Sequence, residues 1–324
     1  MTYFCAVFCI VALAILLCMV DNPRNLPSRS GASSVSARSV EIALIDFHTH
    51  SSASDGVLSP HALLNRAARE GIRRLAITDH DTINGYLSLR GTVLSDSTLD
   101  GVLAECQLVS GAEFSCQWGR LGIHIVALGF DPNAPNLRKH LARLDIARSE
   151  RAVQIAQRLE RAGMPGGLAG ARGLADGAQI GRPHFARWMV EAGHIASEEL
   201  AFKRFLGRGK AGDIAVLWPS LGETVTAICD SGGIAVLAHP LEYKMTATRL
   251  RALTDAFCEA GGKAIEVING RPRPDDKALL WRIADQRHLL VSVGSDFHRD
   301  SAYGARLGVD VKGIPNGRGV WESL

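Results

Sequence analysis

The stretch Ile45-Asp46-Phe47-His48-Thr49-His50-Ser51-Ser52-Ala53-Ser54-Asp55-Gly56 joins the end of an apolar run to a serine-rich loop. His48 and His50 are two residues apart, so in an extended chain both imidazoles point to the same side and can bind one metal ion. Gly56 allows the loop to fold back, which brings the carboxylate of Asp55 toward the same point. An H-x-H pair by itself is weak evidence, but similar residues recur where other apolar runs end.

Apolar, β-branched runs alternate with helical patterns from residue 41 onward. Seven runs are predicted as strands: Glu41–Asp46, Arg74–Thr78, Gln107–Ala112, Ile123–Leu128, Gly233–Ala238, Ala264–Ile268 and Leu289–Val293. Helices are predicted between most of them: Pro60–Glu70, Leu221–Ser231, Ala247–Ala260 and Asp275–Arg287. This alternation favours a parallel α/β barrel or a closely related sheet.

Polar side chains gather at the ends of these predicted strands. They are His48, His50, Asp55, His80, Glu113, His239, Asp296 and His298, and two further groups, His124 and Glu266, lie within predicted strands. Because the C-terminal ends of parallel strands converge on one face, we expect these groups to share a pocket. So many imidazoles and carboxylates in one place require cations, and their number exceeds the needs of a single metal ion. Asp79 and Asp81 flank His80, where they either orient it or cap the loop.

Length and composition indicate a globular enzyme with a full core, since the chain has 324 residues and 47% of them are hydrophobic. The formal net charge of +3 is unevenly distributed, because residues 135–210 hold fourteen Lys and Arg against seven Asp and Glu. This distribution predicts an anionic substrate held between a cation-rich lid and a carboxylate-rich floor. The seven cysteines include no C-x-x-C pair, which indicates a reducing compartment.

The N-terminal segment leaves three interpretations open. Tyr3–Val20 is a run of eighteen residues without a charge, near the lower limit for crossing a bilayer. Residues 1–20 are a membrane anchor, a signal peptide or the product of a start codon assigned too early, and residues 21–40 are predicted as a linker. Arginines follow this run, so an anchor would leave the body in the cytoplasm. The predicted location is therefore cytoplasmic, either free or anchored through residues 3–20.

Several motifs together resemble the PHP (polymerase and histidinol phosphatase) superfamily of metal-dependent phosphoesterases. In chain order they are Asp46-Phe47-His48-Thr49-His50, Ser54-Asp55-Gly56, Thr78-Asp79-His80-Asp81, Gly111-Ala112-Glu113, His124, Ala238-His239-Pro240 and Gly294-Ser295-Asp296-Phe297-His298. Ile180–Arg187 and Leu206–Lys210 make the chain most similar to the branch of nucleoside 3′,5′-bisphosphate phosphatases and RNase AM-type exoribonucleases. The resemblance covers roughly residues 42–324.

This resemblance implies a distorted (β/α)7 barrel formed by residues 41–133 and 218–324, with a mainly helical insertion, residues 134–217, acting as a lid. It also implies three metal ions. The first is held by His48, His50 and Asp296, and Glu113 bridges to a second held by His124 and His239. Asp55, His80 and His298 hold the third. Mn²⁺ is the expected ion, with Fe²⁺, Zn²⁺ or Mg²⁺ as alternatives, and Glu113, Asp296 and His239 are the expected catalytic residues.

The predicted insertion supplies candidate substrate-binding residues. Residues 137–161 have the pattern of an amphipathic helix, and most of its arginines, including Arg151, are expected on a solvated face. Arg148, Arg182, His184 and Lys210 are instead predicted to hold a second phosphate away from the metal ions. The alternative is that they are ordinary surface cations.

The predicted function is hydrolysis of nucleoside 3′,5′-bisphosphates, with a related 5′-to-3′ exoribonuclease activity on short 5′-phosphorylated RNA. Aromatic residues make up only 6% of the chain and no extended basic stripe accompanies them, so neither a long single-strand channel nor a DNA-binding module is predicted. Two alternatives remain: another PHP phosphatase, such as one for histidinol phosphate, and a non-catalytic metal-binding accessory module.

Overall fold

The computed structural model describes residues 44–90, 106–214, 218–270, 272–301 and 305–324. The chain divides into residues 1–40 and a second unit, Glu41–Leu324, to which all these residues belong. The predicted apolar segment and linker, residues 1–20 and 21–40, lie outside the described residues. Within the described part of the chain, no helix has both the length and the apolar character needed to cross a membrane.

The strands form two sheets rather than one. The first has the order β3-β2-β1-β9 and consists of Gln107–Val109, Arg74–Ala76, Leu44–Asp46 and Val309–Asp310. The second has the order β4-β5-β6-β7-β8 and consists of Gly111–Trp118, Leu121–Leu128, Ile234–Leu237, Ala264–Asn269 and Leu290–Gly294. All seven predicted strands are thus present with shifted ends, but no closed sheet is formed by the residues that the structure describes.

The expectation of uniformly parallel strands is wrong for β4, β5 and β6. β4 and β5 form an antiparallel hairpin in which Trp118 pairs with Leu121, and β5 also pairs antiparallel with β6. Gly119 at the tip of the hairpin has φ +61°, a conformation that glycine adopts without steric cost. Among the strands of the described residues, β1–β2, β2–β3, β6–β7 and β7–β8 are parallel pairs.

The predicted strand Gln107–Ala112 in fact comprises the whole of β3 and the start of β4. The break comes at Ser110 and Gly111, where the chain passes from one sheet to the other. A Cβ atom on Gly111 would lie 2.8 Å from the carbonyl oxygen of Ile77, so the two backbones approach too closely for any other residue.

Backbone hydrogen bonds connect the two sheets through the segments that follow β1 and β2. Phe47 N donates to Val293 O at 3.2 Å and Asp296 N donates to His48 O at 2.8 Å. Beyond β2, Asp81 N donates to Glu113 O at 2.9 Å. The histidine-bearing segments therefore lie where the two sheets meet.

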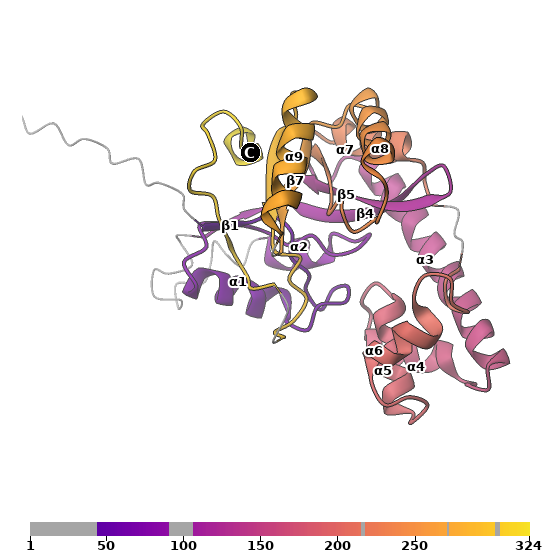
Figure 1. The fold of residues 1–324 in the computed structure, drawn as a ribbon. Helices are drawn as coiled ribbons and strands as arrows, with labels where there is room; N and C mark the ends of the chain where they lie inside the picture. Colours follow the sequence, from indigo (N-terminus) through magenta and orange to yellow (C-terminus); the bar gives the residue numbers. More distant parts are fainter. Residues whose placement is uncertain (1–43, 91–105, 215–217, 271, 302–304) are drawn as a thin grey trace, which may run out of the picture. The chain divides into compact units, whose positions relative to one another are not determined.

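Helices cover the sheets on their outer sides. They are α1 (Pro60–Arg69), α2 (Asn84–Leu89), α7 (Leu221–Asp230), α8 (Ala247–Glu259) and α9 (Pro274–Gln286), and Figure 1 shows α7, α8 and α9 grouped beside the second sheet. Ser59, Ser220 and Thr246 cap α1, α7 and α8 by accepting a hydrogen bond from a first-turn backbone N–H. The four predicted helices are confirmed within two residues at each end.

The segment between β5 and α7 is helical and has its own small core. It contains α3 (Pro135–Arg161), α4 (Gly167–Ala175), α5 (Arg182–Glu191), α6 (Glu198–Ala201) and a short π-helix, Phe202–Leu206. The first half of α3 packs on the main core, and its second half joins α4 and α5, as Figure 1 also shows. α3 thus connects the sheets to the smaller helical cluster.

Candidate metal centre

The turn after β1 buries His48 and His50 completely. The carboxylate of Asp46 organises this turn, since it accepts hydrogen bonds from the backbone N–H of His48 (3.3 Å), Ser295 (2.9 Å) and Gly308 (2.7 Å). The imidazole centroids of His48 and His50 lie 5.2 Å apart. Asp46 therefore links the H-x-H pair to the segment after β8, which also carries Asp296.

The serine-rich loop folds back as the sequence predicts and carries Asp55 to the histidines. A Cβ atom on Gly56 would lie 2.2 Å from the carbonyl oxygen of His50, so the reversal requires glycine. Asp79 fixes the loop by accepting hydrogen bonds from Ser51 N (2.8 Å), Ser51 Oγ (2.6 Å) and Ser54 Oγ (2.6 Å). Of the two interpretations of Asp79, loop capping is the one that these contacts match.

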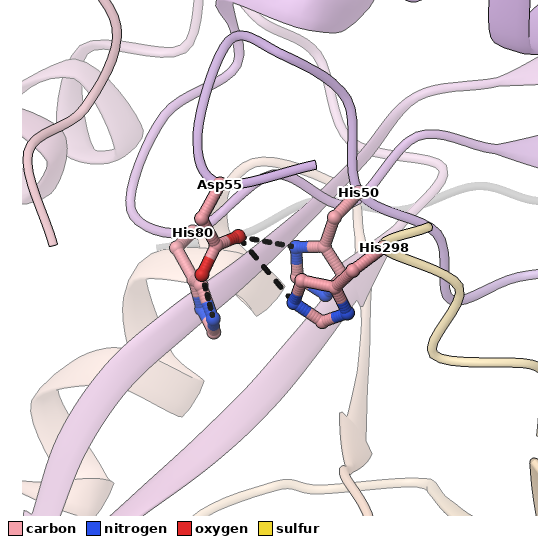
Figure 2. Close-up of side chains that lie close together, drawn as sticks. All are labelled: His50, Asp55, His80 and His298. Atoms are coloured by element: carbon pink, nitrogen blue, oxygen red, sulfur yellow. Dashed lines mark ion pairs between the residues drawn. The ribbon is translucent and has the colours of Figure 1, made fainter. Parts of the chain in front are cut away.

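Asp55 faces three imidazoles. Its carboxylate oxygens lie 3.7 Å from His50 Nδ1, 3.4 Å from His298 Nε2 and 3.7 Å from His80 Nε2. Figure 2 shows the four side chains converging, with the rings of His50 and His298 stacked at a centroid distance of 4.0 Å. One carboxylate and three imidazoles in this arrangement can surround a single cation.

Glu113 on β4 is the centre of the cluster, with a side chain that is 1% exposed. Its carboxylate oxygens lie near five imidazole nitrogens: His48 Nε2 (3.3 Å), His50 Nε2 (3.4 Å), His80 Nδ1 (2.9 Å), His124 Nδ1 (2.8 Å) and His239 Nε2 (2.7 Å). The antiparallel β4–β5 pairing places His124 of β5 on this side, which a parallel arrangement of the same strands would not guarantee.

Asp296 and His298 follow β8 and complete the set. Asp296 Oδ1 lies 3.2 Å from His50 Nε2 and 3.6 Å from His48 Nε2. Asp296 has φ +56° and His239 has φ +26°, both unusual for residues other than glycine. Such strained backbone is concentrated at functional sites.

The electrostatics of the cluster keep its carboxylates ionised despite burial. Burial alone would raise the pKa of Glu113, but His124, His80 and His48 hold it well below its usual range. The pKa of Asp55 is likewise lowered against the effect of burial, chiefly by His80 and by its contacts with His298. Burial and the proximity of His298 lower the pKa of His50 to about 3, so its ring stays neutral, the form that binds metal.

The donor atoms of the cluster fit metal ions. Buried atoms without a hydrogen-bond partner in the described part of the chain include His48 Nε2, both ring nitrogens of His50, His80 Nδ1, Glu113 Oε2 and His239 Nδ1. Orphaned polar atoms at this density are costly unless a ligand satisfies them. The nine predicted ligands are thus brought together, in overlapping groups that each fit one ion: His50, Asp55, His80, His298; His48, His239, Asp296; His48, His50, Glu113; and His80, Glu113, His124.

Comparison with known proteins identifies the family. The PHP domain pattern matches residues 46–157. The 5′-3′ exoribonuclease Rnm of Escherichia coli is 40% identical over 280 residues, which cover 86% of this chain and 93% of that protein. The 3′,5′-nucleoside bisphosphate phosphatase of Chromobacterium violaceum is 37% identical over 284 residues, covering 87% and 97%. The chain belongs to the PHP family.

Solved structures agree with this membership. An amidohydrolase from Chromobacterium violaceum, solved with bound sulfate and no metal, matches the PHP chain with a TM-score of 0.76 and 36% identity over 86% of this chain and 95% of that one. A protein from Bifidobacterium adolescentis described as a metal-dependent phosphoesterase gives a TM-score of 0.71 and 26% identity, covering 82% and 91%. The predicted family is confirmed.

The candidate substrate residues of this PHP chain lie in different environments. Arg148 is buried, where its Nε donates to Asp81 at 2.5 Å and its Nη1 to the carbonyl oxygen of Ile180 at 3.3 Å. Asp81 therefore pairs with Arg148 and also accepts from Ser115 N, rather than orienting the ring of His80. Arg182 Nη1 donates to Leu206 O at 3.2 Å.

The other two candidates are less directly placed. His184 is 2% exposed, and its Nδ1 accepts a hydrogen bond from Gly181 N at 3.1 Å, so it caps the start of α5. Lys210 has an exposed side chain and does not line the crevice that contains Arg148 and Arg182.

Arg148, Arg151 and Arg182 line one narrow crevice, and we call it the arginine crevice. Its full lining is Arg148, Arg151, Ala152, Ile155, Ile180, Gly181, Arg182 and Phe185. The expectation of a solvated Arg151 is wrong. Its Nε is buried without a hydrogen-bond partner in the described residues, and burial together with Arg182 and Arg148 lowers its pKa to about 9. Helical spacing alone did not reveal this burial, because Arg151 is covered by Trp218, a residue distant in sequence.

Two supporting residues were not assigned a role from the sequence. Glu266 on β7 accepts hydrogen bonds from His48 Nδ1 and from the backbone N–H of His239, both at 2.6 Å. The hydroxyl of Tyr243 accepts from His124 N at 2.9 Å and donates to the carbonyl oxygen of Ala238 at 2.9 Å. Glu266 is a carboxylate among the apolar residues of the predicted strand Ala264–Ile268, which was a usable signal, whereas Tyr243 lies in a loop and gave none.

Proposed function

We propose that this PHP protein is a metal-dependent phosphoesterase that releases the 3′-phosphate from nucleoside 3′,5′-bisphosphates and removes nucleotides from the 5′ end of short 5′-phosphorylated RNA. The observation that carries the proposal is the convergence of nine metal-binding side chains next to a crevice lined by three arginines. The relatives named above have these two activities in their names. Both reactions break the bond between phosphorus and a 3′-oxygen beside a 5′-phosphorylated nucleoside.

The proposed cofactors are up to three divalent ions. Mixed imidazole and carboxylate ligands suit Mn²⁺, Fe²⁺ or Zn²⁺ better than Mg²⁺ alone, and the resemblance to PHP phosphoesterases favours Mn²⁺. His48, His50 and Asp296 would hold one ion, Glu113, His124 and His239 a second, and Asp55, His80 and His298 a third. Such ions, when bound, acidify water toward neutral pH and neutralise phosphoryl oxygens. Glu113 contacts five imidazoles, and Asp296 and His239 line the adjoining cavity, so these three are the proposed catalytic residues.

The arginine crevice is the proposed site of the 5′-phosphate. Of the three guanidinium groups, Arg148 pairs with Asp81, and Asp213 interacts with the other two. The buried Nε of Arg151 has no hydrogen-bond partner among the described residues, which leaves a donor for an anion. Backbone and side-chain contacts join this segment to the metal loop: Gln179 N donates to Ala53 O at 3.0 Å, and Arg187 Nη2 donates to Asp55 O at 2.8 Å. His184 supports the crevice by capping α5. Lys210, which is exposed and does not line the crevice, is proposed as a further phosphate-binding cation.

The proposed architecture is a distorted (β/α)7 barrel in which the two sheets are halves of one wall and residues 134–217 form a lid. Hydrogen bonds join the segment after β1 to the segment after β8, and the segment after β2 to β4 itself, which supports this arrangement. We propose a cytoplasmic location, with membrane contact only if residues 3–20 act as an anchor.

The test is phosphate release by the purified chain with Mn²⁺, comparing adenosine 3′,5′-bisphosphate, 3′-AMP, 5′-AMP and histidinol phosphate. A clear preference for the bisphosphate supports both the metal centre and the second phosphate site. Hydrolysis of histidinol phosphate alone would favour the other PHP phosphatases. Hydrolysis of no phosphoester with any of Mn²⁺, Fe²⁺, Zn²⁺ and Mg²⁺ would favour a metal-binding accessory module.

A further inference from the structure

A cavity of about 450 Å³ opens beside His239 and Asp296, which form its inner end. It runs between the segments that follow β6, β7 and β8 and lies outside the arginine crevice, with which it shares no lining residue. Its volume is in the range of sites that bind small organic molecules. The cavity therefore has room for a chemical group larger than a phosphate.

The lining of the cavity combines an apolar wall with a polar rim. Leu241, Val267 and Leu280 contribute to the wall, and Glu242, Asn269, Arg273 and Asp276 to the rim. The rim has two carboxylates for one guanidinium, so a second phosphate is disfavoured there. A nucleoside fits this chemistry, because a base can stack on a guanidinium or an apolar wall while ribose hydroxyls donate to carboxylates.

The cavity and the arginine crevice adjoin different parts of the metal centre. The crevice segment contacts the loop that carries Asp55, whose group comprises His50, Asp55, His80 and His298. The cavity begins at His239 and Asp296, whose group includes His48 and shares no member with the first. A substrate with its 5′-phosphate in the crevice and its next phosphate at the metal centre would therefore continue into the cavity.

We propose that this cavity binds the nucleoside on the 3′ side of the scissile phosphate, which is the second nucleotide of an RNA substrate. This inference rests on the proposed function. In both proposed reactions water adds to phosphorus, the P–O3′ bond breaks, and the 3′-oxygen leaves with a proton. The bisphosphate carries nothing beyond that phosphorus, whereas RNA carries the next nucleotide, so only RNA uses the cavity.

To test the inference, a large side chain is introduced at the rim of the cavity so that it fills the space that the second nucleoside would occupy. Asp276→Trp places an indole at a half-buried position that lines the cavity, and Asp275→Trp places the same side chain at the neighbouring exposed position, which does not line it. Both substitutions remove one carboxylate from the first turn of α9, so they are matched in their effect on the helix. The full-length proteins are compared for kcat/KM on a 5′-phosphorylated dinucleotide and on adenosine 3′,5′-bisphosphate, and thermal unfolding checks their folding.

Asp276→Trp is expected to lower the ratio of dinucleotide to bisphosphate kcat/KM by about tenfold or more, the size of one lost base-stacking contact. Asp275→Trp should keep the wild-type ratio. Binding of a fluorescent 5′-phosphorylated dinucleotide to the metal-free protein should weaken in the first variant only. Equal loss on both substrates, or an unchanged ratio, overturns the inference, whereas a wild-type protein that hydrolyses neither substrate overturns the proposed function itself.

Discussion

His48 Nδ1 donates a hydrogen bond to Glu266 Oε1 at 2.6 Å, and neither side chain is exposed to solvent. Burial would lower the pKa of His48, but Glu266 together with Glu113 and Asp296 raises it well above its ordinary value. The contact fixes the ring so that Nε2 faces Glu113 and the metal centre. Glu266 is thus a positioning residue for a proposed metal ligand.

Glu266→Gln should lower metal affinity and activity by about 10- to 100-fold, because outer carboxylates orient and strengthen histidine ligands. Metal titration followed by kcat and KM measurements at saturating Mn²⁺ would check this. Excess metal should restore part of the rate, which a general loss of folding would not allow. Glu259→Gln, at an exposed position on α8, is the matched control and should behave as wild type.

Glu113→Gln should reduce kcat by more than about 100-fold. Mutation of a residue that only supports a metal ligand typically lowers activity by up to about 100-fold, and Glu113 contacts five imidazoles of the cluster directly. Single-turnover hydrolysis of adenosine 3′,5′-bisphosphate is the measurement. A variant that folds and hydrolyses at the wild-type rate would remove Glu113 from the proposed mechanism.

Strong chelators should abolish hydrolysis, and added Mn²⁺ should restore it, because several buried donor atoms of the cluster, such as both ring nitrogens of His50, have no hydrogen-bond partner among the described residues. Chelation should also lower the melting temperature, since an ion that binds only the folded chain stabilises it. Phosphate release and thermal unfolding, measured on the same dialysed sample, check both expectations. A rate that persists after complete chelation contradicts a metal mechanism.

Arg182→Ala should lower kcat/KM for adenosine 3′,5′-bisphosphate by about tenfold or more, because the loss of one hydrogen bond to a charged group costs ~1.5–3 kcal/mol. Arg151→Ala should act in the same direction because both residues line the crevice. For 3′-AMP, which lacks the 5′-phosphate, the effect should be much smaller. Arg172→Ala, at an exposed position on α4, serves as the control; equal effects on both nucleotides would show that the crevice is not a phosphate site.

His140 on α3 gives a pH dependence of stability that is independent of the metal centre. It is 4% exposed and packs edge-on against Phe114, and burial lowers its pKa to about 4 from an ordinary 6.5. The folded state thus binds the proton less readily than the unfolded state, so this contribution is complete above pH 6.5 and is lost as pH falls toward 4.

Between pH 7.5 and pH 5 the loss from His140 should be about 2 kcal/mol of unfolding free energy. His140→Gln should reduce the difference between the two pH values, whereas His61→Gln, at an exposed position on α1, should leave it as in the wild type. Urea unfolding of each protein at both pH values makes the comparison. An identical pH difference in wild type and His140→Gln would contradict the assignment.

Much of the fold could be predicted because its signals are local. Strand and helix positions follow from the spacing of apolar residues and from caps such as Ser59 and Ser220. Whether neighbouring strands run parallel or antiparallel could not be predicted from local sequence. The chain reverses between β4 and β5 at Gly119, but β5 also pairs with β6, which is more than 100 residues away in sequence. A run of apolar residues fits a parallel or an antiparallel neighbour equally well.

The candidate site divides in the same way. The nine proposed metal-binding side chains could be named because imidazoles and carboxylates at strand ends have few other uses at that density. The arginine crevice could not, since Arg151 differs from the solvated arginines of α3 only in lying under Trp218. Charge on a helix is visible in a sequence, but what covers it is not.

The sequence alone determined the family, the order of the seven predicted strands and of the helices between most of them, and the chemical identity of the proposed metal-binding groups, because each depends on residues close together along the chain. Tertiary structure decided that Glu113 lies among five histidines, that Glu266 contacts His48, and that His239 and Asp296 line a cavity separate from the arginine crevice. Those relationships join residues up to 218 positions apart. They arise only when the two sheets and the helical segment pack together, since burial and contact are properties of the folded chain.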